Sequence, residues 1–207
     1  MVIIFAFDCV SDSLFLQHNS IMILPIVAYG SPVLKERASD ISEFGPELKT
    51  LVADMYETMY NADGCGLAAP QIGKSIRLFV IDAELMDEEK YKGCKMAFVN
   101  AKKLEETGNQ IGYEEGCLSI PGLREEVKRP ELITLQYFDE DGREHTRQFE
   151  GMMARVIQHE YDHIEGKLFT DHLSPLRKRL LQGKLSDITR GKIRHSYPMR
   201  FAQPGKR

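Results

Sequence analysis

Two histidines and a glutamate near residue 160 have the spacing of a catalytic metal site. His159, Glu160 and His163 form the pattern H-E-x-x-H. On a helix, side chains four residues apart lie on one face, with β-carbons about 5–6 Å apart, so both imidazoles could bind one divalent metal. The carboxylate of Glu160 could take a proton from a water molecule that this metal activates. The pattern therefore predicts a metal centre and suggests attack of water on an acyl carbon.

The residues around this motif predict a largely buried helix. Gly166 follows the last apolar position and is a natural helix end. Two histidines inside a buried helix need partners, and a metal supplies one. The alternative is a surface helix whose two histidines and two acids are simply solvated. Burial is favoured by the apolar residues on both sides of the motif, which are Met152, Met153, Val156, Ile157, Tyr161 and Ile164.

A catalytic metal site usually has three protein ligands, and the third must come from elsewhere in the chain. One protease class continues as H-E-x-x-H-x-x-G-x-x-H, but here Phe169 occupies the last histidine position. A downstream glutamate is excluded because Glu165 is the last glutamate of the sequence. Upstream, Cys117 follows a glycine, and a thiolate is a strong transition-metal ligand. On the residues alone, Cys117 is either this ligand or a buried apolar cysteine.

Composition describes an ordinary globular protein with no strong attraction to nucleic acid or membrane. The 207 residues are 43% hydrophobic and 28% charged, with a net charge of −4. The four cysteines lack the spacing of a structural zinc site or a disulfide scaffold, so we expect reduced thiols. No apolar run reaches the roughly 18 residues of a membrane span. Residues 190–207 contain six Lys or Arg and no acid, which predicts a solvated basic tail.

The order of apolar patterns predicts one α+β domain. Residues 46–61 have a helical apolar period, and Pro46 suits the first helical position. The metal motif supplies a second helix, and Ser174-Pro175 begins a third. Between the first two helices we expect strands at 76–82, 96–100, 132–138 and 143–150, a loop at 64–71 and an irregular or bulged stretch at 108–124. Helix, strands and helix in this order favour mostly antiparallel sheets.

Three ordered motifs then make the chain similar to a known family. They are G-x-G-L-A-A-x-Q at Gly64–Gln71, E-G-C-L-S at Glu115–Ser119 and Q-H-E-x-D-H at Gln158–His163. Together they resemble peptide deformylase, a metal-dependent hydrolase that removes the formyl group from the N-terminal methionine of nascent polypeptides. The resemblance implies antiparallel sheets packed around a central metal-binding helix. It covers a catalytic domain at 23–190 and leaves a basic tail at 191–207 and an extra N-terminal segment at 1–22 outside it. Because this segment looks unlike the rest of the chain and Met22 could be the true start, we expect it to be non-native or disordered.

The resemblance assigns roles to residues of the three motifs. The implied metal ligands are Cys117, His159 and His163, and the metal is usually Fe²⁺, although Ni²⁺, Co²⁺ or Zn²⁺ can replace it. Glu160 is the implied general base and acid. The side chain of Gln71 and the backbone N–H of Leu118 are implied to stabilise the oxyanion, although Gln71 alone could also be a loop-capping amide.

A substrate pocket for formyl-methionine is also implied. An extended substrate would lie beside residues 64–66 and bind by β-type hydrogen bonds. Met152 and Val156 could equally be core residues, and Glu115 could instead pair with Arg129 behind the cysteine loop. The positions we assign to the pocket are Gly64, Cys65, Gly66, Tyr113, Glu115, Arg124, Met152 and Val156.

The expected partners are formylated nascent chains in the cytoplasm, with ribosome contact through the C-terminal helix and basic tail, and no membrane. Two other functions compete with this one. A general metallopeptidase would need a third carboxylate or histidine ligand, and none is apparent. A domain that binds metal or ribosome without turnover would not need both Glu160 and Gln71.

Overall fold

The computed structural model describes residues 21–202, so the predicted extra segment at 1–22 lies almost wholly outside the described residues. The described chain contains two sheets, and the larger one has the antiparallel order β2-β3-β4-β5-β6. The predicted α+β class is confirmed. The helices are α1 (Pro46–Asn61), α2 (Gly151–Ile164) and α3 (Pro175–Thr189); the strands are β1 (Ile26–Val27), β2 (Gly66–Ala68), β3 (Leu78–Asp82), β4 (Lys95–Cys117), β5 (Ile120–Phe138), β6 (Glu144–Glu150) and β7 (Met199–Arg200).

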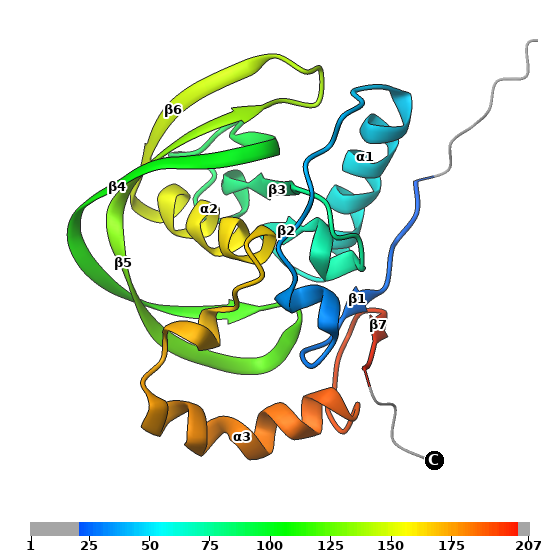
Figure 1. The fold of residues 1–207 in the computed structure, drawn as a ribbon, viewed down its shortest axis with the longest axis vertical. Helices are drawn as coiled ribbons and strands as arrows, with labels where there is room; N and C mark the ends of the chain where they lie inside the picture. Colours follow the sequence, from blue (N-terminus) through cyan, green and yellow to red (C-terminus); the bar gives the residue numbers. More distant parts are fainter. Residues whose placement is uncertain (1–20, 203–207) are drawn as a thin grey trace, which may run out of the picture.

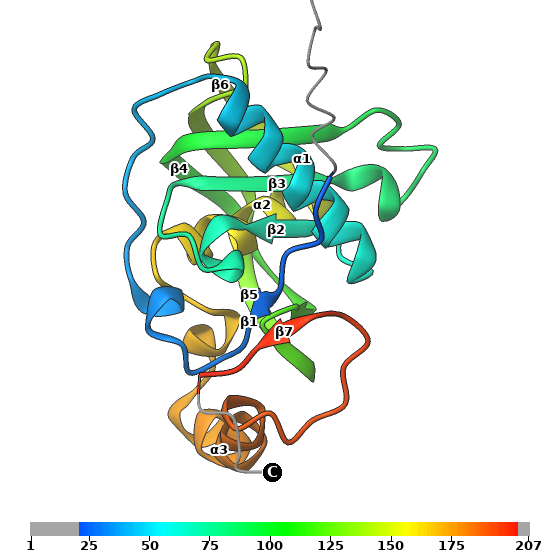
Figure 2. The same cartoon turned by 90° about the vertical axis from the view of Figure 1, so that its right-hand side faces the viewer.

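Strand β3 is buried on both faces and separates two parts of the core. Leu78 and Val80 face α1, whereas Phe79 and Ile81 face α2, because side chains alternate across a strand. Such a strand is a continuous apolar run. Figure 2 shows α1 in front of β2 and β3, with α2 behind them. The predicted bounds of α1 are confirmed, because Pro46 begins the helix and Asn61 ends it.

The long β4–β5 ribbon wraps around α2, as Figure 1 shows. The predicted irregular or bulged stretch at 108–124 is a paired part of the β4–β5 ribbon, and its bulges lie between Thr107 and Gln110 and between Gly116 and Cys117. Register shifts at several points let the ribbon bend. Gly112 makes room for a cross-strand neighbour, since a β-carbon there would lie 2.9 Å from the side chain of Glu126.

Helix α2 is the centre of the fold. It begins at Gly151, whose φ of +62° permits a sharp turn directly after β6. From Ala154 to Ile164 every residue of the helix is buried. Its apolar side chains Ala154, Ile157 and Ile164 pack in one cluster with Phe79 of β3. The polar side chains on the remaining face are therefore also enclosed, and each needs a partner.

The C-terminal segment returns to the domain. Ser174 caps α3 by accepting a hydrogen bond from the N–H of Arg177 at 3.2 Å. Beyond α3, β7 pairs in parallel with β1, so the expected basic tail is held to the domain at residues 199–200, while residues 191–202 are all exposed or half-buried. Among residues 21–202, no helix combines the length and apolar character needed to cross a membrane.

Candidate metal centre

Two elements distant in sequence bring the three predicted ligands together. His159 and His163 lie one turn apart on α2, with ring centroids 5.1 Å apart. Cys117 is the last residue of β4, and its Sγ lies 3.3 Å from Nε2 of His163. The donor atoms of Cys117, His159 and His163 all lie within 4.8 Å of one another. One sulfur and two nitrogens in this space could hold one transition-metal ion.

The surroundings of the two rings fit a metal site. Nδ1 of His159 lies 3.0 Å from the carboxylate of Glu115, so Nε2 is the ring nitrogen that could serve as a ligand. Burial and the charge of His159 hold the pKa of His163 well below its usual range, so His163 is neutral, as a ligand must be. Phe169, which cannot ligate, stacks against the His159 ring with centroids 6.2 Å apart.

Glu160 is a buried carboxylate next to this centre. Its side chain is 4% exposed, and Oε2 has no hydrogen-bond partner among the described residues. Burial and the nearby charge of Glu115 raise the pKa of Glu160 to about 7. A β-carbon at Gly66 would lie 2.5 Å from Oε1 of Glu160, so a glycine is needed there. A carboxylate with this pKa is suited to both accepting and returning a proton near neutral pH.

The side chain of Gln71 contacts both the loop and the predicted metal centre. Its Oε1 accepts a hydrogen bond from the N–H of Ala68 at 2.7 Å, which caps the loop. Its Nε2 donates to Sγ of Cys117 at 3.5 Å, so the amide N–H₂ group lies at the centre. The expected loop at 64–71 is partly wrong, because Gly66–Ala68 form β2 and Ala69–Ile72 form a 3₁₀ turn. Pairing of β2 with the buried β3 fixes Gln71 in place.

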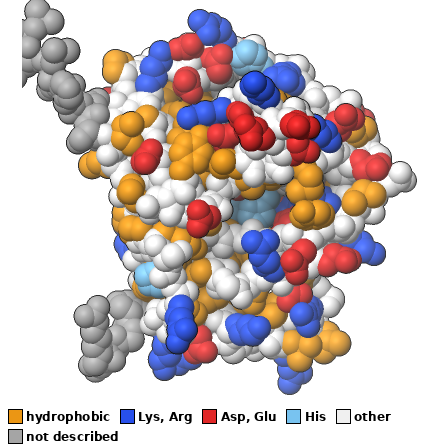
Figure 3. Space-filling model, turned by 180° about the vertical axis from the view of Figure 1, so that it is seen from behind, with side chains coloured by type: hydrophobic (Ala, Val, Ile, Leu, Met, Phe, Trp, Pro, Cys, Tyr) orange, Lys and Arg blue, Asp and Glu red, His pale blue; other side chains and the backbone are white. Residues whose placement is uncertain are grey.

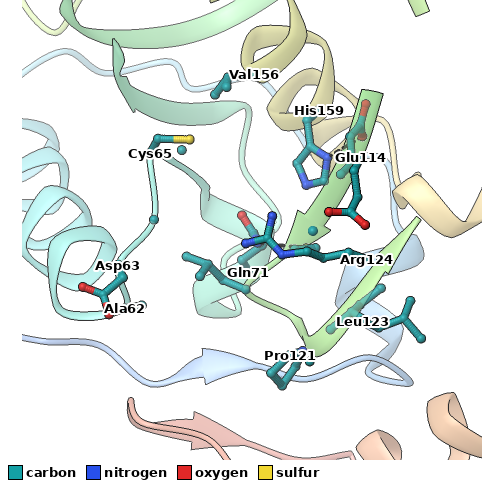
Figure 4. A pocket seen from close by; sticks show the side chains of 18 of the residues that line it. Ala62, Asp63, Cys65, Gln71, Glu114, Pro121, Leu123, Arg124, Val156 and His159 are labelled. Carbon is teal, nitrogen blue, oxygen red and sulfur yellow. Dashed lines mark hydrogen bonds and ion pairs between the residues drawn. The ribbon is translucent and has the colours of Figure 1, made fainter. Parts of the chain in front are cut away.

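A cavity of about 890 Å³ opens beside the centre and is lined by His159, Glu160 and Gln71. In Figure 4, the side chains of His159, Gln71 and Arg124 lie around this space, with Cys65 at the left and Val156 at the top. Figure 3 shows the molecule from behind. Histidine atoms are visible near the middle of this face, with hydrophobic and charged side chains around them. The structure brings all eight predicted pocket positions to the cavity wall, namely Gly64, Cys65, Gly66, Tyr113, Glu115, Arg124, Met152 and Val156.

Some of these positions have two roles. Val156 is 8% exposed, packs in the core and also lines the cavity. Tyr113, at 48% exposure, lies at the rim. Residues 194–197 also line the cavity, which the sequence did not indicate because only the return of the chain to β1 brings them there.

Glu115 lies at the centre of a buried ionic network behind the predicted metal ligands. Arg129 donates to it through Nε at 2.7 Å and Nη2 at 3.0 Å, as the predicted pair requires. Arg129 also donates to Asp162 at 2.7 Å. Sequence reasoning missed the contact of Arg155, whose Nη1 donates to Glu115 at 3.0 Å. The available signal was its position one helical turn before His159.

The fold and the site together define a metal-dependent hydrolase. A Cys-His-His donor set beside a buried carboxylate, at the base of an open cavity, has the parts needed to activate water against a bound acyl group.

Comparisons with known proteins identify the family. The family model described as polypeptide deformylase matches residues 23–179. The peptide deformylase of Cytophaga hutchinsonii is 54% identical over 87% of this chain and 98% of its own length, and that of Flavobacterium johnsoniae is 53% identical over 89% and 99%. The solved peptide deformylase structure from Legionella pneumophila has a TM-score of 0.74 at 40% identity, covering 82% of this chain and 97% of its own.

The chain belongs to the peptide deformylase family. It is accordingly a metal-dependent hydrolase that uses a single metal and removes the formyl group from the N-terminus of nascent polypeptides.

Proposed function

We propose that Cys117, His159 and His163 hold the metal, that Glu160 transfers the proton, and that Gln71 and the N–H of Leu118 stabilise the oxyanion. The observation that carries this proposal is the convergence of the three donor atoms within 4.8 Å beside a buried carboxylate. For the native metal we propose Fe²⁺, with Ni²⁺, Co²⁺ or Zn²⁺ as alternatives that the same donors accept. Iron with a thiolate ligand implies sensitivity to oxygen.

The reaction is a hydrolysis of the formyl C–N bond. When bound, the metal acts as a Lewis acid and lowers the pKa of water from about 15.7 towards about 7. Glu160 accepts the proton of the attacking water as the new C–O bond forms. The N–H₂ group of Gln71 and the N–H of Leu118 donate to the oxyanion, and one such donor is worth about 10²–10³ in rate. Glu160 then gives its proton to the departing amine, and formate is released.

The substrate pocket is proposed to take the methionine side chain between Met152 and Val156. Strand β2 is at the edge of its sheet, and an edge can receive an extended peptide through main-chain hydrogen bonds. Gly64 and Gly66 allow close approach of that peptide. Tyr113 and Arg124 at the rim would contact the residues after methionine.

The proposed place of action is the cytoplasm, with contact to the ribosome through α3. Leu176 and Leu180 on this helix are 70% and 65% exposed, and basic side chains surround them. A ribosome-pelleting assay tests this contact. Arg179→Glu with Lys184→Glu should reduce co-sedimentation, whereas Lys92→Glu on a distant exposed loop should not; equal binding of all variants would refute it.

The central experiment is anaerobic purification, metal analysis and a formate-release assay on formyl-methionyl peptides and their unformylated equivalents. We expect about one metal per chain and turnover only of the formylated peptide. Glu160→Ala should keep the metal and lose about 10²–10⁴ in kcat. Cys117→Ala should lose metal and activity together. Glu57→Ala, a change on an exposed position of α1, is the matched control. Activity of Glu160→Ala within a few-fold of wild type would eliminate this mechanism.

A further inference from the structure

The turn that carries Leu118 is held from outside its own hairpin. Cys117 of β4 pairs with Ile120 of β5, so Leu118 and Ser119 form a two-residue turn. The carbonyl of Ser119 accepts a hydrogen bond from the N–H of Tyr29 at 2.8 Å. The carbonyl of Leu118 accepts one from the phenol O–H of Tyr197 at 2.7 Å. Both carbonyls of the turn are therefore bound by residues near the ends of the chain.

The two donors belong to one structural unit. Tyr29 follows β1 and Tyr197 precedes β7, and these strands pair with each other. Two further backbone bonds of 2.9 Å, from Ile26 to Pro198 and from Ala28 to Arg200, tie the two segments together. Figure 2 shows β1 and β7 side by side, close to β5. The β7 segment lies beyond residue 179, where the family match ends.

We propose that Tyr197 is a positioning residue that orients the Leu118 backbone for catalysis. This inference rests on the proposed function, in which the N–H of Leu118 donates to the oxyanion. The O–H bond to the Leu118 carbonyl fixes the peptide plane that follows Leu118. Pairing of Cys117 with Ile120 holds the chain on the other side of Leu118. With both flanks held, rotation about the Leu118 Cα is restricted and its N–H keeps its direction. A hydrogen-bond donor whose direction is already fixed stabilises the oxyanion more than a mobile donor, because it does not have to reorganise during the reaction.

The surroundings of Tyr197 support this role. Its ring is half-buried and packs in the same hydrophobic cluster as Leu118. Its backbone carbonyl accepts a hydrogen bond from Nδ1 of His195 at 2.8 Å, which stiffens the segment. Tyr197 also lines the cavity, where it touches no predicted metal ligand through a hydrogen bond. The phenol oxygen can therefore be removed without removing a ligand or the ring packing.

The test compares the metal-loaded wild-type enzyme with Tyr197→Phe on a formyl-methionyl tripeptide. We expect kcat to fall about three- to tenfold with KM within about twofold, because the donor is misaimed but not lost. The visible absorption of the Co²⁺-loaded enzyme, which reports the Cys117 ligation, should not change. Replacement of Tyr197 by para-aminophenylalanine, which keeps an N–H donor at the same position, should restore most of kcat. Tyr137→Phe, in the core away from the cavity, is the matched control.

Each result decides the proposal. Unchanged kcat in Tyr197→Phe, or a change in KM alone, would overturn it. A loss of kcat with an altered Co²⁺ spectrum would also overturn it, because the loss would then come from the cysteine ligand. Absence of formate release by the wild-type holoenzyme would overturn the proposed function as well, so the two failures are distinguishable. Reduced kcat, an unchanged spectrum and rescue by the amino analogue would establish Tyr197 as the positioning residue.

Discussion

Glu115 accepts a hydrogen bond from Nδ1–H of His159 at 3.0 Å, and this contact determines which nitrogen of the ring faces Cys117. An ionised carboxylate only accepts hydrogen bonds, so Nδ1 carries a proton, and in the neutral ring that binds a metal the lone pair is then on Nε2. Burial alone would raise the pKa of Glu115, but hydrogen bonds from His159 and Arg129 hold it well below its usual range. The carboxylate therefore stays charged across the functional pH range.

Removal of this charge should weaken metal binding. Glu115→Gln keeps the size of the side chain but no longer favours the Nδ1–H tautomer of His159 so strongly. Loss of such a partner typically costs about 10–100-fold in metal affinity. Competition of the metal-loaded enzyme with a chelator, followed by metal analysis, measures the effect. Glu126→Gln, at an exposed position of β5, should retain wild-type affinity, and equal affinity of both variants would contradict the assigned role.

Arg155 should contribute mainly to stability. Its guanidinium is enclosed and donates to Glu115 at 3.0 Å, to the carbonyl of Val127 at 3.1 Å and to the carbonyl of Ile111. Arg155→Met removes the Arg155 hydrogen bond from each of these acceptors while filling similar space. Because Arg129 still pairs with Glu115, we expect a loss of about 2–3 kcal/mol in the free energy of unfolding.

Urea denaturation of the metal-loaded protein measures this difference. Lys128→Met, at an exposed position beside the same network, should change stability by no more than about 0.5 kcal/mol. If both variants unfold at the same urea concentration, the Arg155 contacts do not stabilise the fold.

Local patterns in the sequence predicted α1 and α2, whereas long-range pairing had to come from the structure. Pro46 and the helical period of Leu48, Val52 and Met55 are contained within α1 itself, so its bounds could be read directly. The ribbon from 101 to 116 was missed because its side chains are mostly exposed. Such a segment shows no alternation between apolar and polar faces, which is the signal for a strand.

The residues of the site also differ in how far the sequence could predict their positions. The spacing of His159 and His163 could be read from one helix, but the approach of Cys117 depends on a bent ribbon that closes over that helix. Sequence spacing therefore left the cysteine undecided until the family resemblance supplied it. The Arg155 contact depends on the same ribbon. Tyr197 depends on the pairing of two short strands from opposite ends of the chain, for which two residues in each give no periodic signal.

Gly66→Ala should damage catalysis more than folding. A β-carbon at this position would lie 2.5 Å from Oε1 and 2.9 Å from Cδ of Glu160. The carboxylate would have to move, and a displaced base loses much of the roughly 10²–10⁴-fold that general base catalysis provides. We therefore expect kcat to fall by about 10²-fold while metal content is unchanged.

Gly183→Ala is the matched control for this change. Gly183 lies within α3, and a β-carbon there would meet no atom within 4 Å. Alanine should raise the free energy of unfolding by up to about 1 kcal/mol, because it has the higher helix propensity. Its turnover should equal that of wild type. Wild-type turnover in Gly66→Ala would mean that Glu160 is not held where the structure has it.

The carboxylate of Asp171 should make stability depend on acid pH. Its Oδ2 accepts hydrogen bonds from Nζ of Lys35 at 2.5 Å and from the N–H of Leu168 at 2.8 Å. These contacts join the 3₁₀ turn Phe169–His172 to the turn Pro32–Lys35 near the start of the domain. Burial alone would raise the pKa of Asp171, but the bond from Lys35 and the bond from Leu168 outweigh it and lower the pKa.

A pKa that is lower in the folded state gives stability that is present above the unfolded value and lost as the pH falls through the folded value. Asp171→Asn lacks this charge at every pH. Since the pair is partly exposed, we expect Asp171→Asn to be less stable than wild type by at most about 1 kcal/mol at pH 7. Urea denaturation between pH 7 and pH 3 should show the two proteins converging as the pH falls below the unfolded pKa of about 3.9. A difference that stays constant over this range would mean that the pairing does not depend on the charge of Asp171.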